Sequence, residues 1–166
     1  VTLEVRVAAN QCLREGVEKG ALDLAVLFQE PGLELPGGEV IDRLRRVWTA
    51  APTLRVEEGE PVPLVLYEPP CLFRDAALQA LEKAGRPWRI AVTTPSLSGI
   101  RAAVRAGLGV AVRTERWLEA DLRTPPGRLP ELPAVDLVLL GADTVDAEAN
   151  RRLCSVLRDA LKDAGA

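Results

Sequence analysis

The sequence predicts an α/β fold in two lobes, with mainly parallel sheets, and three observations lead to this prediction. Short apolar runs typical of buried strands alternate along the chain with the periodic patterns of amphipathic helices. Glycine follows several of the helix patterns, as it commonly does where a helix ends. A polar, proline-rich connection at residues 52–63 and a return of the chain near 139–143 divide the pattern. We therefore expect one lobe from residues 1–51 plus 140–166 and a second lobe from residues 52–139.

The first lobe is expected to begin with two strands around a short helix. Residues 2–7 alternate between polar and apolar side chains, which is typical of a half-buried strand. Residues 10–20 form a helix pattern in which Leu13 and Val17 lie four positions apart. Residues 21–28 have the composition of a strand that is buried on both faces. The order strand, helix, strand predicts a parallel pair with a right-handed crossover.

The remaining elements of the first lobe come from both ends of the chain. Residues 29–39 contain glycines and prolines and predict a loop, and residues 41–51 predict a further strand. Three arginines beside that strand are expected to form a solvated face: Arg43, Arg45 and Arg46. Residues 135–140 predict the last strand, and Asp143 or Thr144 would cap a closing helix. Its apolar stripe would consist of Val145, Ala149, Leu153, Val156, Leu157, Ala160 and Leu161.

The second lobe continues the alternation of strands and helices. We predict strands at residues 63–67, at residues 88–92 and from residue 109 onward. The strand at 88–92 is expected to be buried. Helices are predicted at residues 71–84, with Leu78 and Leu81 pointing inward, at 96–106 and at 114–122. Residues 123–134 hold four prolines and predict a long loop.

The segment from the strand at 88–92 into the following helix contains the first candidate site. Thr94 and Ser96 are good N-cap residues, and Leu97, Ile100 and Val104 would form one apolar helix face. The first N–H groups of a helix lack partners and carry partial positive charge, so they suit a carboxylate or another small anion. The alternative is that the two hydroxyl groups only cap their own helix.

The composition argues against several classes of function. The 166 residues carry a net charge of −3 and a pI of about 5.2, which does not favour nucleic-acid binding by this segment itself. The sequence has no apolar run of the ~18 residues that a membrane span requires, and no signal peptide. The absence of histidine and the wide spacing of the three cysteines argue against a metal site or a cofactor. No catalytic arrangement such as paired carboxylates, a Ser-His pair or a phosphate-binding glycine loop is recognisable, so we do not expect an enzyme.

The order of the motifs resembles the effector-binding domain of LysR-type transcriptional regulators. The residues that carry the resemblance are Gly20–Val26, Arg46–Pro52, Pro63–Tyr67, Cys71–Arg74, Ala84–Arg89 and Ser96–Val110. The resemblance implies a type II periplasmic-binding-protein fold, in which two lobes are joined by crossing strands with a ligand cleft between them. It also implies a cytoplasmic regulator that binds a small effector. Such a regulator pairs its effector domains as dimers and acts as a tetramer. It contacts DNA only through a helix-turn-helix domain, which is absent from this chain.

Geometry and resemblance together select nine candidate ligand-binding residues. They are Phe28, Gln29, Pro70, Cys71, Leu72, Thr93, Thr94, Ser96 and Leu97. For Cys71, a small apolar side chain that fills a gap is the alternative to a ligand contact. For Arg74, we expect a surface ion pair with Asp75 or Glu68. Arg113 and Thr114 stand where the family often has a proline, which puts a charge near the cleft.

The sequence also leaves the identity of the whole protein open. The chain begins with valine and contains no methionine, so we expect a fragment of a longer protein. The first strand and helix of the first lobe are either absent or lie outside this sequence. A free-standing solute-binding protein of the same fold is the alternative to a regulator, and an upstream signal peptide instead of a helix-turn-helix would distinguish it.

Overall fold

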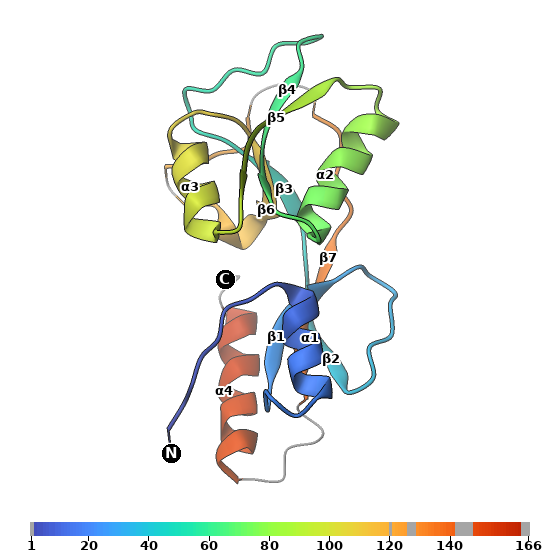
Figure 1. Cartoon of the computed structure of the whole chain (residues 1–166), viewed down its shortest axis with the longest axis vertical. Coiled ribbons are helices and arrows are strands. Elements are labelled where there is room, and N and C mark those ends of the chain that lie inside the picture. The colour runs from blue at the N-terminus through green and yellow to red at the C-terminus, as the bar shows by residue number, and fades with distance from the viewer. Residues whose placement is uncertain (1, 120, 126–128, 142–147, 164–166) are drawn as a thin grey trace. The chain divides into compact units, whose positions relative to one another are not determined.

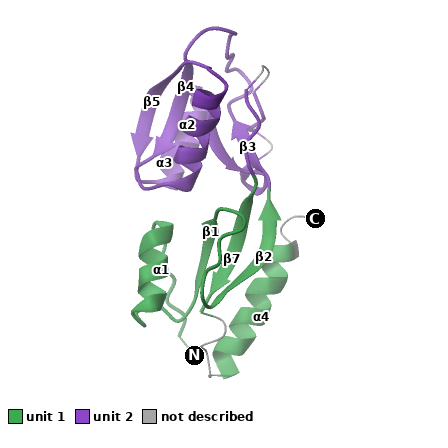
Figure 2. Cartoon of the chain, turned by 90° about the vertical axis from the view of Figure 1, so that its right-hand side faces the viewer, with its two compact units in different colours: residues 1–44, 134–166 green, residues 45–133 purple. Residues whose placement is uncertain are grey.

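The chain divides into two compact units. The computed structural model describes residues 2–119, 121–125, 129–141 and 148–163. Unit 1 consists of residues 1–44 and 134–166, and unit 2 consists of residues 45–133 (Figure 2).

Unit 1 is a three-stranded antiparallel sheet between two helices (Figure 1). Its elements are α1 (Asn10–Glu18), β1 (Ala25–Gln29), β2 (Gly38–Leu44), β7 (Val135–Leu140) and α4 (Glu148–Asp163). The central strand β7 is buried at every position, because successive side chains point alternately to two covered faces. Val138 and Leu140 pack toward Leu13 and Val17 of α1, whereas Leu139 packs toward Cys154 of α4. The helices therefore cover opposite faces of this sheet.

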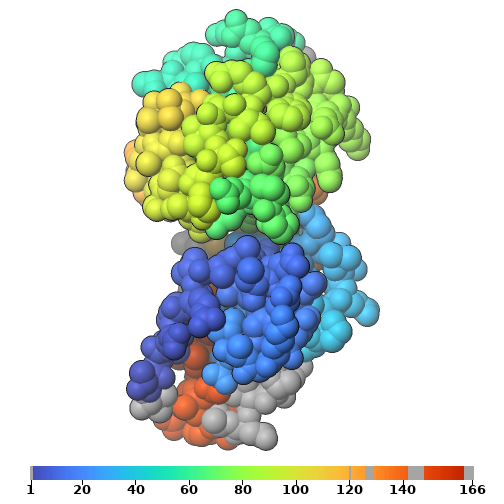
Figure 3. Space-filling view, in the orientation of Figure 1, coloured from blue at the N-terminus to red at the C-terminus, as the bar shows by residue number. Residues whose placement is uncertain are grey.

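The first predicted strand does not form. Residues 2–7 have no strand conformation, and the Val7 side chain is 85% exposed. This segment lies on the outside of unit 1, where Figure 3 shows it in dark blue. An alternating pattern gives a strand only where a neighbouring strand accepts its hydrogen bonds, and no described strand pairs with these residues. The predicted parallel pair is therefore wrong, and β1 pairs with β7 in the antiparallel sense.

The strand predicted at residues 41–51 is in fact two strands in different units. β2 pairs with β7 of unit 1, and β3 (Arg46–Thr49) pairs with β6 (Ala111–Thr114) of unit 2. The alternation of side chains continues through Arg45, where the chain changes from one partner strand to another. The sequence pattern therefore does not show that two strands are present. The expected solvated face is also wrong for Arg46, whose side chain is buried.

The closing helix is confirmed, but part of its expected stripe is not. Val156 is exposed, and the buried position belongs to Cys154, with Leu157 and Leu161 partly buried beside it. The expected caps Asp143 and Thr144, together with Val145, lie outside the described residues.

Unit 2 contains the parallel strands of the protein. β4 (Val62–Tyr67) pairs in parallel with β5 (Trp88–Thr94), and a parallel bridge between Leu64 and Val110 connects β4 to the segment that leads into β6. The helices α2 (Leu72–Lys83) and α3 (Leu97–Arg105) lie on opposite sides of these strands in Figure 1. Mainly parallel sheets were expected, yet the described strand pairs other than β4–β5 are antiparallel.

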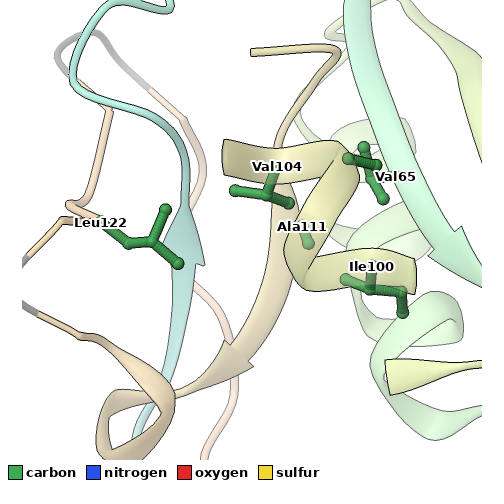
Figure 4. Packing of buried hydrophobic residues seen from close by; sticks show 6 residues of the cluster. Val65, Ile100, Val104, Ala111 and Leu122 are labelled. Atoms are coloured by element: carbon green, nitrogen blue, oxygen red, sulfur yellow. The ribbon is translucent and has the colours of Figure 1, made fainter. Parts of the chain in front are cut away.

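One apolar cluster fixes α3 against the strands of unit 2. Figure 4 shows Val65 of β4, Ile100 and Val104 of α3, Ala111 of β6 and Leu122 gathered together. Three expectations about this region are wrong, the first two because side chains at the margin of a small sheet stay exposed. These are the buried strand at 88–92, whose Ile90 is exposed, the inward Leu97, which is exposed, and the helix at 114–122, of which only a 3-10 turn at Glu115–Trp117 forms.

Candidate functional site

The strands β4 and β5 end next to each other, and each leads into a helix. Tyr67, the last residue of β4, is paired with Thr94, the last residue of β5, and the Glu68 N–H donates to the Thr94 carbonyl at 3.2 Å. Because parallel strands have their carboxyl ends at one edge, α2 and α3 both begin at this edge. The dipoles of two helix N-termini contribute positive potential at this edge, whereas the carboxylates of Asp75, in the first turn of α2, and of Glu68 oppose it.

The hydroxyl groups at the start of α3 are engaged in capping. The Ser96 Oγ accepts from the Gly99 N–H at 3.2 Å and lies 2.7 Å from the Ser98 Oγ. The Thr94 Oγ1 accepts from the Ser96 N–H at 3.2 Å. A Cβ atom at Gly99 would lie 2.7 Å from the Thr94 Oγ1, so a glycine is required for this close approach. Thr93 and Leu97 flank the cap and are exposed.

The start of α2 has a different chemistry. Its N-cap residue is Cys71, whose side chain makes no cap hydrogen bond, in contrast to Ser96 at the start of α3. Cys71 and Leu72 are half-buried, and Pro70 is exposed after a cis peptide bond with Pro69. The expected ion pair of Arg74 is not formed, because its Nη1 donates to the Tyr67 carbonyl at 3.3 Å.

Arg113 is a buried cation beside the start of α2. Its side chain is 7% exposed, and its guanidinium carbon lies 5.2 Å from the centre of the Phe73 ring and 5.8 Å from that of Trp117. Burial lowers the pKa of the Arg113 guanidinium, and the neighbouring Cys71 and Tyr67 act in the opposite direction. Its Nε is enclosed and has no hydrogen-bond partner among the described residues. The sequence showed the charge at this position but not that it is enclosed.

A second buried arginine contacts the same aromatic ring. Arg46 of β3 is 4% exposed, and its guanidinium carbon lies 5.7 Å from the centre of the Phe73 ring. Its Nη1 donates to the Pro133 carbonyl at 3.2 Å. Two guanidinium groups therefore lie near the Phe73 ring, and both contribute positive potential near the first turn of α2.

An exposed ionic cluster lies along α3 and shares the Trp117 ring with Arg113. Arg105 pairs with Asp121 at 2.6 Å and also with Glu119, which in turn pairs with Arg101. The hydrogen bond from Arg105 lowers the pKa of the Asp121 carboxyl. Arg101 also stacks on the Trp117 ring at 4.9 Å. These arginines have carboxylate partners, whereas Arg113 has none among the described residues.

The structure brings together seven of the nine predicted site residues within unit 2. Pro70, Cys71 and Leu72 lie at the start of α2, and Thr93, Thr94, Ser96 and Leu97 lie at the end of β5 and the start of α3.

The other two predicted site residues end β1 of unit 1. The Phe28 carbonyl accepts from the Asn10 Nδ2 at 2.8 Å, and the Gln29 Nε2 donates to the Leu33 carbonyl at 2.9 Å. Ligand contact by any of the nine residues stays a prediction.

Two kinds of feature are absent from the described part of the chain. No group of three or more histidine, cysteine, aspartate or glutamate side chains is placed to hold a metal ion. No described helix combines the length and apolar character needed to cross a membrane.

Comparison with known proteins identifies the family. Residues 1–160 match the LysR substrate binding domain, and the chain therefore belongs to this family, as the resemblance implied. The regulator DgdR of Burkholderia cepacia is 40% identical over 140 residues, which cover 82% of this chain and 47% of that protein. The regulator PecT of Dickeya dadantii is 28% identical over 165 residues, covering 98% of this chain and 51% of that protein. Both are described as HTH-type transcriptional regulators rather than enzymes, and this chain spans about half their length.

Solved structures confirm the fold class. DarR of Vibrio fischeri, solved in complex with DNA, superimposes with a TM-score of 0.74 at 14% identity over 95% of this chain and 57% of that chain. Full-length HypT of Salmonella typhimurium, described as a hypochlorite-specific LysR-type regulator, gives 0.76 at 13% identity over 95% and 58%. The predicted type II periplasmic-binding-protein-like α/β fold is thereby confirmed.

Proposed function

We propose that this chain is the effector-sensing domain of a LysR-type transcriptional regulator and that its effector is a small anion. The observation that carries the proposal is the convergence of two helix N-termini, α2 and α3, at the carboxyl ends of β4 and β5. Free amides and helix dipoles at such an edge favour a negatively charged ligand. The contacts proposed for Phe28 and Gln29, and the location of the ligand in a cleft, rest on the family resemblance.

The other parts of the proposal concern the longer regulator. DNA binding is assigned to a helix-turn-helix segment, because the relatives are HTH-type regulators and this acidic chain has a net charge of −3. The proposed regulator acts in the cytoplasm without catalysing a reaction. It pairs through its effector domains and works as a tetramer. A free-standing solute-binding protein is not favoured, because the relatives that match are transcriptional regulators.

A pair of substitutions at Ser96 tests the proposal in the longer regulator with a promoter reporter. Ser96→Ala removes the cap on the Gly99 N–H and is expected to destabilise the domain by about 1 kcal/mol. Ser96→Asp preserves a capping oxygen but adds a negative charge where the anion would bind. We expect thermal-shift screening to find a stabilising anion, and the Asp variant to lose the reporter response more completely than the Ala variant. A normal response of the Asp variant would contradict the proposal.

A further inference from the structure

Arg113 has a feature that the fold alone does not explain. A buried guanidinium is expected to be paired, because moving a charge out of water is costly unless hydrogen bonds or an opposite charge compensate it. The Arg113 Nε has no partner among the described residues, and no ion pair of Arg113 is found there. Its contacts are the aromatic rings of Phe73 and Trp117, which supply only part of that compensation.

The place of Arg113 in unit 2 connects it with the start of α2. Phe73, on which the guanidinium stacks, is the second residue of α2. Cys71, the uncapped N-cap residue, and Tyr67, at the end of β4, are close enough to affect the charge of the guanidinium. Arg46 brings a second cation close to the Phe73 ring. An anion at the first turn of α2 would therefore meet the positive end of the helix dipole and the unpartnered arginine together.

We propose that Arg113 is the specificity-determining residue of the effector site and that the effector carries a carboxylate, which the guanidinium binds at the first turn of α2. This inference rests on the proposed function and names the chemical class of the ligand. A carboxylate is favoured because the planar guanidinium presents parallel N–H donors that match its two oxygens. A spherical halide is attracted by the positive potential, but it cannot accept two parallel hydrogen bonds from the guanidinium as a carboxylate does.

Thermal-shift and calorimetric titrations of the full chain test the inference with four sodium carboxylates: acetate, glycolate, succinate and benzoate. The corresponding neutral amides control for shape, and sodium chloride and bromide at equal ionic strength control for charge. The variants are Arg113→Leu, Arg113→Lys, and Arg89→Leu as a matched control. Arg89 is an exposed arginine of β5, so its replacement removes the same charge from the surface of unit 2.

We expect at least one carboxylate, but not its amide, to raise the melting temperature of the unchanged protein and of Arg89→Leu. Arg113→Leu should weaken its binding by roughly tenfold or more, the usual effect of losing hydrogen bonds to a charged group. Arg113→Lys keeps the charge but not the planar fork, so its binding should be intermediate. The inference is overturned if no carboxylate binds, if Arg113→Leu binds normally, or if halides stabilise the protein as well as carboxylates do.

A reporter assay in the longer regulator separates this inference from the proposed function. If a carboxylate binds through Arg113 yet leaves promoter activity unchanged, the ligand assignment stands and the sensory role fails. If the promoter responds to a neutral ligand and the response is intact in Arg113→Leu, the sensory role stands and the assignment of Arg113 fails.

Discussion

Replacing Gly109 by alanine is expected to separate two backbone segments in the centre of unit 2. A Cβ atom at this position would lie 2.6 Å from the Pro63 carbonyl oxygen and 3.0 Å from its carbonyl carbon. Both atoms belong to the backbone of β4, so no side-chain rotation can relieve the contact. Two hydrogen bonds of 2.8 Å hold these segments together, one from the Val110 N–H to the Pro63 carbonyl and one from the Val65 N–H to the Val110 carbonyl.

The expected loss of stability follows from these contacts. Overpacking in a core costs about 1–3 kcal/mol. The two hydrogen bonds are weakened rather than lost and together add about 1 kcal/mol, so Gly109→Ala should lower the free energy of unfolding by about 2–4 kcal/mol. For a chain of this size the melting temperature should fall by roughly 5 to 15 °C. Urea unfolding and thermal melts measure both quantities.

Gly59→Ala is the matched control for this substitution. Gly59 has a φ of +89° but nothing within 4 Å of an added Cβ atom, so alanine there brings only the left-handed backbone strain of about 1–2 kcal/mol. If Gly109→Ala is no more destabilising than Gly59→Ala, the close approach of β4 to the segment before β6 does not restrict the side chain at position 109, and the reasoning is refuted.

Two further predictions concern stability and pH. Leu81→Ala in α2 removes a fully buried side chain and should lower the free energy of unfolding, measured in urea, by about 2–5 kcal/mol. The control Leu108→Ala, at an exposed position, should change that free energy by less than about 0.5 kcal/mol. Equal effects of the two substitutions would contradict the burial assigned to Leu81. The hydrogen bond from Arg45 lowers the pKa of Glu115, so this pair stabilises the fold above the ordinary pKa of glutamate and loses its effect as pH falls through the folded-state value. Glu115→Gln should therefore lower the melting temperature at pH 7 and match the unchanged protein once the pH lies below the folded-state pKa of Glu115. A difference that does not shrink as the pH falls would contradict this assignment.

Local sequence patterns were reliable where an element depends on its own residues. The helix α3 was predicted from its cap residue Ser96 and its apolar face, and the structure confirms the cap and the burial of Ile100 and Val104. Gly107, predicted to end that helix, has a φ of +73°, a conformation that glycine adopts without strain. The strand at 135–140 was also predicted correctly, because a continuous apolar run indicates burial on both faces.

Patterns failed where an element depends on a partner far away in the chain. Residues 2–7 alternate like a strand but remain exposed, since hydrogen bonds to a neighbour, and not alternation, make a strand. Residues 41–51 carry one pattern but pair with β7 on one side and β6 on the other. Strand direction is likewise a property of the assembled sheet, which explains why parallel sheets were predicted where most described pairs are antiparallel.

The sequence by itself determined the family, the alternating α/β pattern and the residues that begin α2 and α3, because caps, periodicity and motif order are encoded locally. Only the tertiary structure decided that these two helix starts lie at the ends of paired parallel strands. It also decided that Arg113 is enclosed between Phe73 and Trp117, residues 40 positions before it and four after it. Burial of a charge depends on side chains that converge from separate segments, and a single sequence does not specify that convergence.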